Sequence, residues 1–587
     1  MREKIYKVLK YIDLRLPFIR QMLKKARDFY RATSAKVVRK RIESIGFDRY
    51  LEGLDSRSRN MSNKNKSALY AKSAIRLGGS GYSIERYALA KKAVDFDDSQ
   101  VALYALFSSS QELGVVEESW KVLQAYEKKY GSKPKRDLSY LKMMSSPINH
   151  FKMMGYVSQD FKVKSLPADS CVKICYVLHN SLPYSSGGYA TRAQGVAEGL
   201  RENGFEVVGL TRPGYPVDII SGSYRLDLEE FPDKVNGIDY HRVLAPKRRE
   251  YKAADYVERS AIKIQDKLEE LKPDMVMAAS NYIAALPALI AARNKNLPFI
   301  YEVRGFWEVS KASREPDYHG SIGYKVQEAM EAFVANSADY VFTLTRAMKE
   351  ELVARGVEEN KITLLPNCCD TSRFYPKTAD ENLKEEIGIK SGATVIGYIG
   401  TFVQYEGLDN LAEACAILHE KGHDFSLLLV GSEDTSGGGR GAIAEKVISI
   451  AKKAGFSDKL VMPGRIPHHE VERYYSIVDI APFPRKPLPV CEMVSPMKPL
   501  EAMSLEKPVI VSSVSALSEM VVDQHNGLIF EKGNVRDLAD KLEILINDPQ
   551  LRSEMGKKGR EWVCKERDWK NIGKIVRDTI DKKAVIS

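Results

Sequence analysis

The amino-acid sequence predicts an α/β fold class, with two doubly wound domains that follow an all-α N-terminal region. The first observation is that strand-like and helix-like segments alternate from about residue 165 to the end of the chain, which is typical of doubly wound sheets. The second is that the hydrophobic pattern before this point has a helical period only. The third is the length of 587 residues, which exceeds one hydrophobic core and suggests about three domains.

The composition is that of a soluble globular protein, with 44% hydrophobic and 28% charged residues. The longest nearly apolar run, Tyr282 to Ala292, is much shorter than the roughly 20 residues of a membrane-spanning helix. The N-terminus also lacks the apolar core of a signal peptide. The seven cysteines form no CxxC pair, which favours a reducing compartment over a disulfide framework. We therefore expect a cytoplasmic protein.

Residues 1–41 account for the net charge of the whole chain. They hold 14 Lys or Arg and 3 Asp or Glu, a net charge of +11 that equals the total. Between these charges, apolar residues recur at three- and four-residue steps, which predicts a basic amphipathic helix. Such a helix can bind an anionic membrane surface, dock on the protein itself or pair with a second copy. Nucleic-acid binding is not expected, because the remaining residues sum to zero charge.

The segments that follow predict a linker and then a helical domain. Residues 42–66 are polar, which predicts a linker. Residues 67–150 contain two helix pairs offset by about 33 residues, and this pattern resembles a short tetratricopeptide-type array. It predicts a surface for a protein partner or for self-association, or alternatively a helical spacer. Asp95-Phe96-Asp97 lies between two of these helices, so we interpret it as a turn rather than a metal site.

The first doubly wound domain opens with a predicted strand over residues 172–178 and a glycine-rich loop. Gly187 and Gly188 in this loop allow the backbone to approach a ligand closely. The amphipathic helix that begins at Tyr189 can meet a phosphate with its N-terminus. The loop is not a GxGxxG motif, which disfavours a dinucleotide as the ligand.

A second ligand edge is expected after the predicted strand 299–303, because doubly wound domains bind ligands at the carboxyl ends of their strands. The sequence at this edge is YEVRGFWE. It contains Arg304, which can hold an anionic acceptor or a diphosphate with two hydrogen bonds. Glu302 or Glu308 could orient this arginine or take the proton of an acceptor. The alternative is an Arg–Glu pair that only lies on the surface.

The second doubly wound domain contains a loop that enters a short helix. Pro499 suits the first helical position, where its missing N–H costs nothing. The N–H groups of Leu500 and Glu501 would then have no intrahelical acceptor, and with Lys498 beside them they predict an anion site. The alternative is that Glu501 only complements the helix dipole. Earlier in this domain, Gly400 ends a buried strand and is expected at a carboxyl edge.

The segment SPMKPLEAMSLEKPVIVSS, residues 495–513, resembles the donor-binding segment of glycosyltransferase family 4, whose members have the GT-B fold. The loop with Gly187 and Gly188 resembles the acceptor-domain loop that faces the donor diphosphate in this family. The exit motif of the first domain is also similar, with Pro366, Asn367, Asp370 and Phe374 retained. The resemblance implies that Glu501 holds the ribose of a nucleotide and that loop amides before it hold the diphosphate.

The same resemblance implies the domain organisation. Two Rossmann-like domains are expected to face a cleft, an acceptor domain over residues 165–380 and a nucleotide-sugar donor domain over residues 381–567. Residues 568–587 would form a C-terminal helix that crosses back to the first domain.

The chain departs from the family pattern in two places. Members carry a second glutamate eight positions before the one that matches Glu501; Met493 stands there, so the implied sugar contact falls to Glu492, one residue out of register. Members also commonly carry an arginine and a lysine where this chain has Thr401 and Glu406. We expect three other cations to compensate: Arg465, Arg485 and Lys498.

The resemblance implies a retaining glycosyltransferase of the hexosyltransferase type, which uses a nucleotide diphosphate sugar and needs neither a metal nor another cofactor. The basic N-terminus and the cysteine usage add a location. Together they predict transfer to a glycolipid or polysaccharide acceptor by a protein bound peripherally to the cytoplasmic face of the cell membrane. Two alternatives stay open: a nucleotide-sugar epimerase or hydrolase on the same fold, and a degenerate transferase that serves as an assembly scaffold.

Overall fold

A computed structural model describes residues 37–38, 40–77, 82–113, 115–130, 171–219, 227–251, 253–390, 392–433 and 441–586. Most of the predicted amphipathic helix of residues 1–41 and the last part of the predicted helical domain, residues 131–150, lie outside the described residues. The chain divides into two compact units, and each is described by itself. One comprises Met1–Ser146 with Glu315–Gln327, and the other comprises Pro147–Arg314 with Glu328–Ser587.

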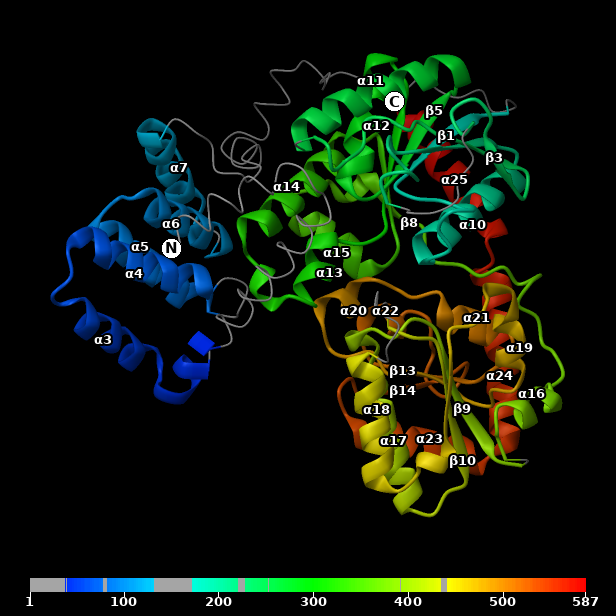
Figure 1. Cartoon of the computed structure of the whole chain (residues 1–587). Coiled ribbons are helices and arrows are strands. Elements are labelled where there is room, and N and C mark those ends of the chain that lie inside the picture. Colours follow the sequence, from blue (N-terminus) through cyan, green and yellow to red (C-terminus); the bar gives the residue numbers. More distant parts are fainter. Residues whose placement is uncertain are drawn as a thin grey trace. The chain divides into compact units, whose positions relative to one another are not determined.

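Helices α3 to α7 follow one another in the first unit, and each packs against the next (Figure 1). Helix α4 also packs against α6. Fully buried alanines at these contacts, such as Ala71, Ala90 and Ala105, allow the helices to approach closely. The assignment of the helix pairs to the tetratricopeptide type stays a prediction. The bounds are Phe47–Ser58 (α3), Asn63–Arg76 (α4), Ser83–Phe96 (α5), Gln100–Leu113 (α6) and Val116–Tyr130 (α7).

The predicted linker over residues 42–66 is wrong, because α3 and the start of α4 occupy it. Tyr50 and Leu54 lie four residues apart and are both buried, so they give α3 an apolar face despite its polar composition. That face packs on α4, and the hydroxyl of Tyr70 in α4 donates to Asp55. Tertiary packing therefore outweighs the low helix propensity of the segment.

The first α/β domain contains an eight-stranded sheet of order β3-β4-β2-β1-β5-β6-β7-β8. Its strands are parallel except for β3, which pairs antiparallel with β4. The strands are Lys173–Leu178 (β1), Glu206–Thr211 (β2), Asp233–Val235 (β3), Ile238–His241 (β4), Met275–Ala279 (β5), Phe299–Val303 (β6), Tyr340–Thr343 (β7) and Ile362–Leu364 (β8). The helices are Gly188–Glu202 (α10), Ala253–Leu271 (α11), Tyr282–Asn294 (α12), Trp307–Ala312 (α13), Ile322–Ser337 (α14) and Arg346–Ala354 (α15).

The second α/β domain contains two parallel three-stranded sheets, β11-β10-β9 and β12-β13-β14, which a bridge between Ile396 and Ile480 joins. The strands are Thr394–Ile399 (β9), Phe425–Val430 (β10), Leu460–Gly464 (β11), Ala481–Phe483 (β12), Val509–Ser512 (β13) and Leu528–Phe530 (β14). The helices are Glu381–Glu386 (α16), Leu408–Glu420 (α17), Ala442–Ala454 (α18), Val471–Ser476 (α19), Pro489–Met493 (α20), Lys498–Ser504 (α21), Ser515–Ser518 (α22), Val535–Asn547 (α23) and Pro549–Glu566 (α24).

The last helix, α25 (Lys570–Ile586), returns to the first α/β domain and packs against α10 (Figure 1). Trp569, Ile572 and Val576 enter the core that α10 forms over β1. Gly195 and Gly199 of α10 permit this contact, because a Cβ at either position would overlap Trp569. The C-terminal segment is therefore part of the hydrophobic core of the first α/β domain.

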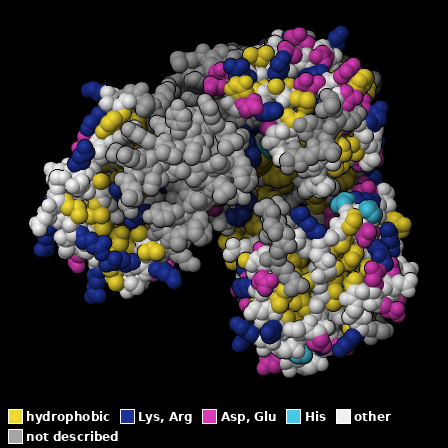
Figure 2. Space-filling model, in the orientation of Figure 1, with side chains coloured by type: hydrophobic (Ala, Val, Ile, Leu, Met, Phe, Trp, Pro, Cys, Tyr) yellow, Lys and Arg dark blue, Asp and Glu magenta, His cyan; other side chains and the backbone are white. Residues whose placement is uncertain are grey.

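Charged side chains of both signs are interspersed over the α/β domains on the face shown in Figure 2. This agrees with the charge balance of the sequence, in which residues 42–587 sum to zero. Among the described residues, no helix has the length and apolar character that crossing a membrane requires.

Candidate functional site

A cavity of about 150 Å³ lies between the two α/β domains of the second unit. Because parallel strands end at a common edge, the loops after β1 and β6 meet there, and each domain contributes one side. The first domain supplies residues from the start of α10 and from the ends of β6, β7 and β8, and the second supplies the loop of residues 494–497. The lining residues are Gly188, Tyr189, Arg192, Arg304, Leu344, Asn367, Val494, Ser495, Pro496 and Met497.

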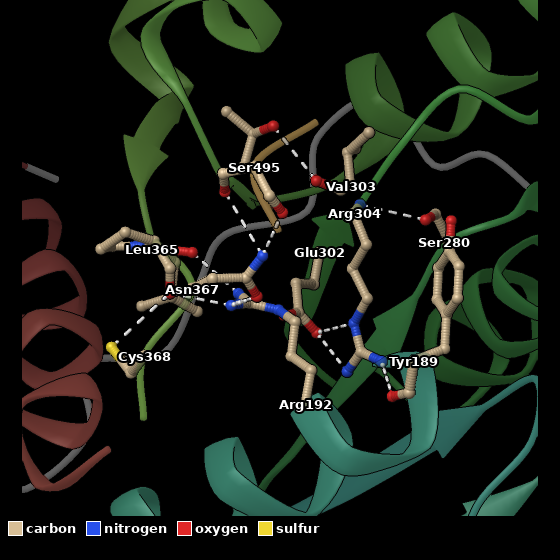
Figure 3. A network of polar contacts seen from close by, with 12 residues as sticks. Tyr189, Arg192, Ser280, Glu302, Val303, Arg304, Leu365, Asn367, Cys368 and Ser495 are labelled. Carbon is tan, nitrogen blue, oxygen red and sulfur yellow. Dashed lines mark hydrogen bonds and ion pairs between the residues drawn. The ribbon is translucent and has the colours of Figure 1, made fainter. Parts of the chain in front are cut away.

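Glu302 is fully buried beside this cavity and binds two arginines (Figure 3). Its Oε1 accepts from Arg192 Nε at 2.9 Å, and its Oε2 accepts from Arg304 Nε at 2.9 Å. Burial alone would raise the pKa of Glu302, but the charges of Arg304 and Arg192 lower it to about 2. The three groups together therefore carry one net positive charge at the wall of the cavity.

Arg304 lines the cavity, and its remaining contacts fix its orientation. Its Nη1 donates to the carbonyl oxygen of Tyr189 at 2.9 Å, and its Nη2 donates to the hydroxyl of Tyr176. The negative charge of Glu302 raises the pKa of Arg304 although burial opposes it, so the guanidinium stays charged. Of the two candidate partners for Arg304, the structure selects Glu302.

Glu308 does not orient Arg304, which is the first of the two roles predicted for it. Its side chain is fully buried, and its Oε1 binds Arg355 Nη1 at 2.7 Å, away from Arg304. The reason is local geometry. Residues 302 and 304 lie on one face of an extended strand end, whereas Glu308 lies in α13, which turns its side chain toward α15. A direct role of Glu308 in orienting Arg304 is excluded.

Arg192 and Asn367 were not predicted as site residues, yet they connect the two domains (Figure 3). Arg192 Nη1 donates to Asn367 Oδ1 at 3.0 Å and to the carbonyl oxygen of Pro366 at 2.8 Å. Asn367 Nδ2 in turn donates to the carbonyl oxygen of Ser495 at 2.7 Å. The sequence held one signal for Arg192, which is a lone arginine on an otherwise apolar face of α10.

A second buried carboxylate organises the donor side of the site. Glu406 Oε1 binds Arg485 Nη2 at 2.9 Å and Lys498 Nζ at 3.2 Å. Burial alone would raise the pKa of Glu406, but Arg485 and Lys498 lower it to about 2. This cluster also has one net positive charge. Arg485 Nη1 further donates to the carbonyl oxygen of Val494 at 2.8 Å and so holds the cavity loop.

Lys498 and Gly400 are in direct proximity at the carboxyl end of β9. Gly400 has a φ of +154°, and a Cβ there would overlap the side chain of Lys498. Lys498 Nζ donates to the hydroxyl of Tyr398 at 2.7 Å, and 22% of its side chain is exposed. Arg465 follows β11 at the same sheet edge but is exposed on the surface. Lys498 and Arg485 therefore belong to one cluster, and Arg465 lies apart from it.

The amides of Leu500 and Glu501 are not the free donors that the sequence predicted. Both donate to the carbonyl oxygen of Met497, at 2.9 Å and 3.1 Å, because α21 begins one residue before Pro499 and its N-cap Met497 is already helical. The Glu501 carboxylate, in contrast, accepts no hydrogen bond from any described residue. Burial raises the pKa of Glu501 to about 7, against the opposing charges of Lys498 and Arg373.

Glu492 does not reach the cavity, which contradicts its predicted contact with the sugar. Its Oε2 accepts from the backbone N–H of Ser515 at 2.8 Å and from the hydroxyl of that residue at 2.9 Å. Its Oε1 binds Lys532 Nζ at 2.7 Å. Glu492 lies in α20, which packs against α22, so the one-residue shift of the motif turns the carboxylate toward α22 instead of the cavity.

Both α/β domains match models of sugar-transferring domains. Residues 187–368 match the glycosyl transferase 4-like domain, and residues 379–562 match glycosyl transferases group 1. The capsular polysaccharide biosynthesis glycosyltransferase CapM of Staphylococcus aureus is 29% identical over 286 residues, which cover 48% of this chain and 69% of CapM. An uncharacterized glycosyltransferase of Methanocaldococcus jannaschii is 23% identical over 412 residues, 69% of this chain and 96% of that protein.

The fold has the same architecture as a solved glycosyltransferase of Rickettsia africae, with a TM-score of 0.53 and 17% identity, over 70% of this chain and 98% of that chain. HepE of Anabaena in complex with UDP superposes with a TM-score of 0.55 and 16% identity, over 70% of this chain and all of that chain. The protein is a glycosyltransferase of the GT-B fold, with the cavity at the junction of its two domains.

Proposed function

We propose that the protein is a retaining hexosyltransferase that moves a sugar from a nucleotide diphosphate sugar to a glycan or lipid-linked acceptor. One observation carries the proposal. Two buried carboxylates, Glu302 in the first domain and Glu406 in the second, each hold a pair of cations beside the loop of residues 494–497. A departing diphosphate between them would meet a net positive charge from both domains.

The donor side of the proposal rests on Lys498 and Glu501. Lys498 is the most exposed member of the Glu406 cluster and can turn from Glu406 to a phosphate oxygen. Glu501 has a carboxylate without a protein partner, which suits the two hydroxyl groups of a ribose. In the first domain, Gly188 at the start of α10 is close to Met497, because a Cβ added at Gly188 would lie 3.7 Å from Met497 Cε. The first turn of α10 can therefore face the same diphosphate.

These cations provide the leaving-group stabilisation without a metal ion, and we propose a metal-independent reaction on that ground. The buried ion pairs hold Arg304 and Arg485 in place before the donor binds, so little reorganisation of these two side chains is needed during transfer. No side chain of the protein is assigned as a nucleophile. The corresponding mechanism is attack by the acceptor on the face of the donor sugar from which the diphosphate leaves, with the leaving phosphate taking the proton of the acceptor.

The acceptor class and the location rest on the relatives and on the N-terminus. CapM is named for capsular polysaccharide biosynthesis, and residues 1–41 have the composition of a helix that binds anionic membrane surfaces. We propose that the protein acts peripherally at the cytoplasmic face of the cell membrane, and that the helical unit binds a protein partner. Sedimentation with vesicles containing an anionic lipid should pull down the full chain and not a variant that lacks residues 1–41.

The donor assignment is tested by thermal unfolding in the presence of UDP, GDP and ADP. At 100 times its dissociation constant, a ligand should add about 2.7 kcal/mol to the free energy of unfolding. One diphosphate should stabilise the protein, and Glu501→Ala should lose most of this effect. Glu554→Ala, an exposed glutamate of α24, is the matched control and should retain it. No stabilisation by any of the three would favour the assembly-scaffold alternative.

The reaction type is tested with the sugar nucleotide of the base identified above. NMR of the product should show the anomeric configuration of the donor sugar in the new glycosidic bond. Inversion would refute the retaining mechanism. Release of free sugar alone, or interconversion of the donor sugar, would identify a hydrolase or an epimerase.

A further inference from the structure

Polar atoms without protein partners lie along the carboxyl edge of the first sheet, on three neighbouring strands next to β6, which ends just before Arg304. The neighbouring strands β2, β1 and β5 end at Thr211, at Leu178 before His179, and at Ala279 shortly before Asn281. Thr211 Oγ1, His179 Nδ1 and Asn281 Oδ1 are buried, and none has a hydrogen-bond partner among the described residues. Buried polar atoms in this state destabilise a fold unless a ligand or water completes them.

Asn281 is fixed close to Arg304 by the pairing of β5 with β6. Ala279 pairs with Glu302, and the hydroxyl of Ser280 accepts a hydrogen bond from the backbone N–H of Arg304 at 3.0 Å. Asn281 precedes α12, yet its side chain does not cap that helix. Its amide oxygen therefore lacks a partner among the described residues, at the same sheet edge as Arg304.

An aromatic group connects this edge to the cavity. The ring of His179 packs edge-to-face on the ring of Trp307, with centroids 4.8 Å apart. The ring of Tyr189 packs on the same indole, with centroids 6.2 Å apart, and Tyr189 itself lines the cavity. The indole of Trp307 thus contacts both His179 and Tyr189, and only Tyr189 of these three lines the cavity.

Apart from the Glu302 cluster, whose net positive charge lies at the wall of the cavity, two further arginines near this edge of the sheet are paired within the protein. Arg212 binds Asp218 at 2.7 Å and 3.0 Å with both terminal nitrogens, and Arg355 binds Glu308 at 2.7 Å. Burial and the charge of Arg212 lower the pKa of His179 to about 3, so its imidazole is neutral. A neutral imidazole and an amide can each donate and accept, which matches hydroxyl groups and not a charged group.

We propose that His179, Asn281 and Trp307 form the subsite that binds the acceptor, and that the acceptor presents a neutral sugar ring there. Trp307 would pack on the apolar face of the ring, and His179 and Asn281 would exchange hydrogen bonds with its hydroxyl groups. The subsite adjoins Arg304 and the cavity, where the donor sugar is expected. This inference rests on the proposed function and specifies the chemical class of the acceptor.

The test measures consumption of the sugar nucleotide by the full-length protein with added model acceptors. The acceptors are methyl glycosides of glucose, galactose, mannose and N-acetylglucosamine, and the comparison compounds are glycerol 3-phosphate and 1-octanol. At least one methyl glycoside should stimulate consumption, and neither comparison compound should. His179→Phe and Asn281→Ala should each reduce this stimulation at least tenfold, whereas His469→Phe, an exposed histidine, should not.

A separate measurement distinguishes a failed acceptor site from a failed proposed function. The shift in Tm that UDP, GDP or ADP causes should be the same in both variants as in the wild type, because their donor domain is unchanged. Stimulation that survives in both variants would overturn the subsite, and stimulation by glycerol 3-phosphate or octanol alone would overturn the sugar class. If no nucleotide shifts the Tm of the wild type, the proposed function itself fails.

Discussion

The side-chain amide of Asn367 donates a hydrogen bond to the carbonyl oxygen of Ser495 at 2.7 Å, across the junction between the two α/β domains. The same side chain accepts from Arg192 at 3.0 Å, and Arg192 binds Glu302, which holds Arg304. The loop of residues 494–497 is held from its other side by Arg485. Hydrogen bonds to two successive carbonyl groups of this loop, Val494 and Ser495, therefore link the two buried carboxylates of the site through the backbone of the loop.

Asn367→Ala should weaken both folding and transfer. It removes one acceptor from Arg192 and one donor from the Ser495 carbonyl, and each unpaired buried group costs about 1–3 kcal/mol. We expect a lower Tm and a fall in kcat/KM of roughly tenfold or more, since about 1.4 kcal/mol corresponds to a factor of ten. Asn294→Ala, which removes an exposed side-chain hydrogen bond on α12, is the control. Equal kinetics for the two variants would contradict a role of Asn367 in the site.

Glu406→Gln should destabilise the protein at neutral pH by about 3–5 kcal/mol, because it leaves Arg485 and Lys498 without their counter-charge. The pKa of Glu406 is lowered from 4.5 to about 2 in the folded state, so its stabilising effect is complete above about pH 4.5 and is lost as pH falls toward 2. The free energy of unfolding, measured with denaturant, should therefore differ strongly between wild type and variant at pH 6, and this difference should shrink steadily toward pH 2. A difference that does not change with pH would exclude the ion pairs as its cause.

Binding of a nucleoside diphosphate should strengthen between pH 6 and pH 8. The pKa of Glu501 is raised to about 7 by burial, and only the ionised carboxylate can accept from both ribose hydroxyls. Because the pKa of this group is raised from 4.5, the unliganded fold should lose some stability as pH rises from 4.5 to 7. Calorimetric titration of the wild type and of Glu501→Gln should show a pH dependence that the variant lacks. Pyrophosphate, which has no ribose, should behave alike in both proteins.

Gly400→Ala should raise the KM for the sugar nucleotide clearly, whereas its effect on the Tm should be small. The added Cβ would displace the side chain of Lys498, and the φ of +154° is unfavourable for alanine. We expect a rise in KM for the sugar nucleotide of at least fivefold, measured beside the Tm. Gly53→Ala in α3, where an added Cβ meets nothing within 4 Å, should change neither quantity for the worse.

The doubly wound domains and the ligand-binding edge at Arg304 could be predicted from the sequence. The hydrophobic periods of strands and helices, and the binding of ligands at the carboxyl ends of strands, can be read from short segments of the chain. The spacing of Glu302 and Arg304 placed both on one face of a strand end, and the structure pairs them. The predicted pairing of Glu308 with Arg304 and the predicted sugar contact of Glu492 were wrong for a common reason. Both lie in short helices, where a shift of one residue rotates a side chain by about 100°.

Contacts between residues that are far apart in the sequence could not be predicted from local patterns. Arg192 meets Asn367 across 175 positions of sequence, and Asn367 meets Ser495 across 128. Glu406 was noted in the sequence only as a position where family members carry a cation, although its carboxylate binds both Arg485 and Lys498. The helix α3 was missed because its two buried residues lie within a polar segment. In each case the deciding interaction is tertiary and has no periodic signal in the sequence.

The chain passes between the two α/β domains at residue 369 and again at residue 568, and these crossings are bonded to each other. The N–H of Cys369 donates to the carbonyl of Arg567 at 2.8 Å, and the N–H of Trp569 donates to the carbonyl of Cys369 at 3.3 Å. The two segments that cross between the domains therefore lie side by side and are joined by a parallel bridge between Cys369 and Asp568. A relative movement of the two domains that slid one of these segments past the other would break both hydrogen bonds, so the paired crossings oppose that movement.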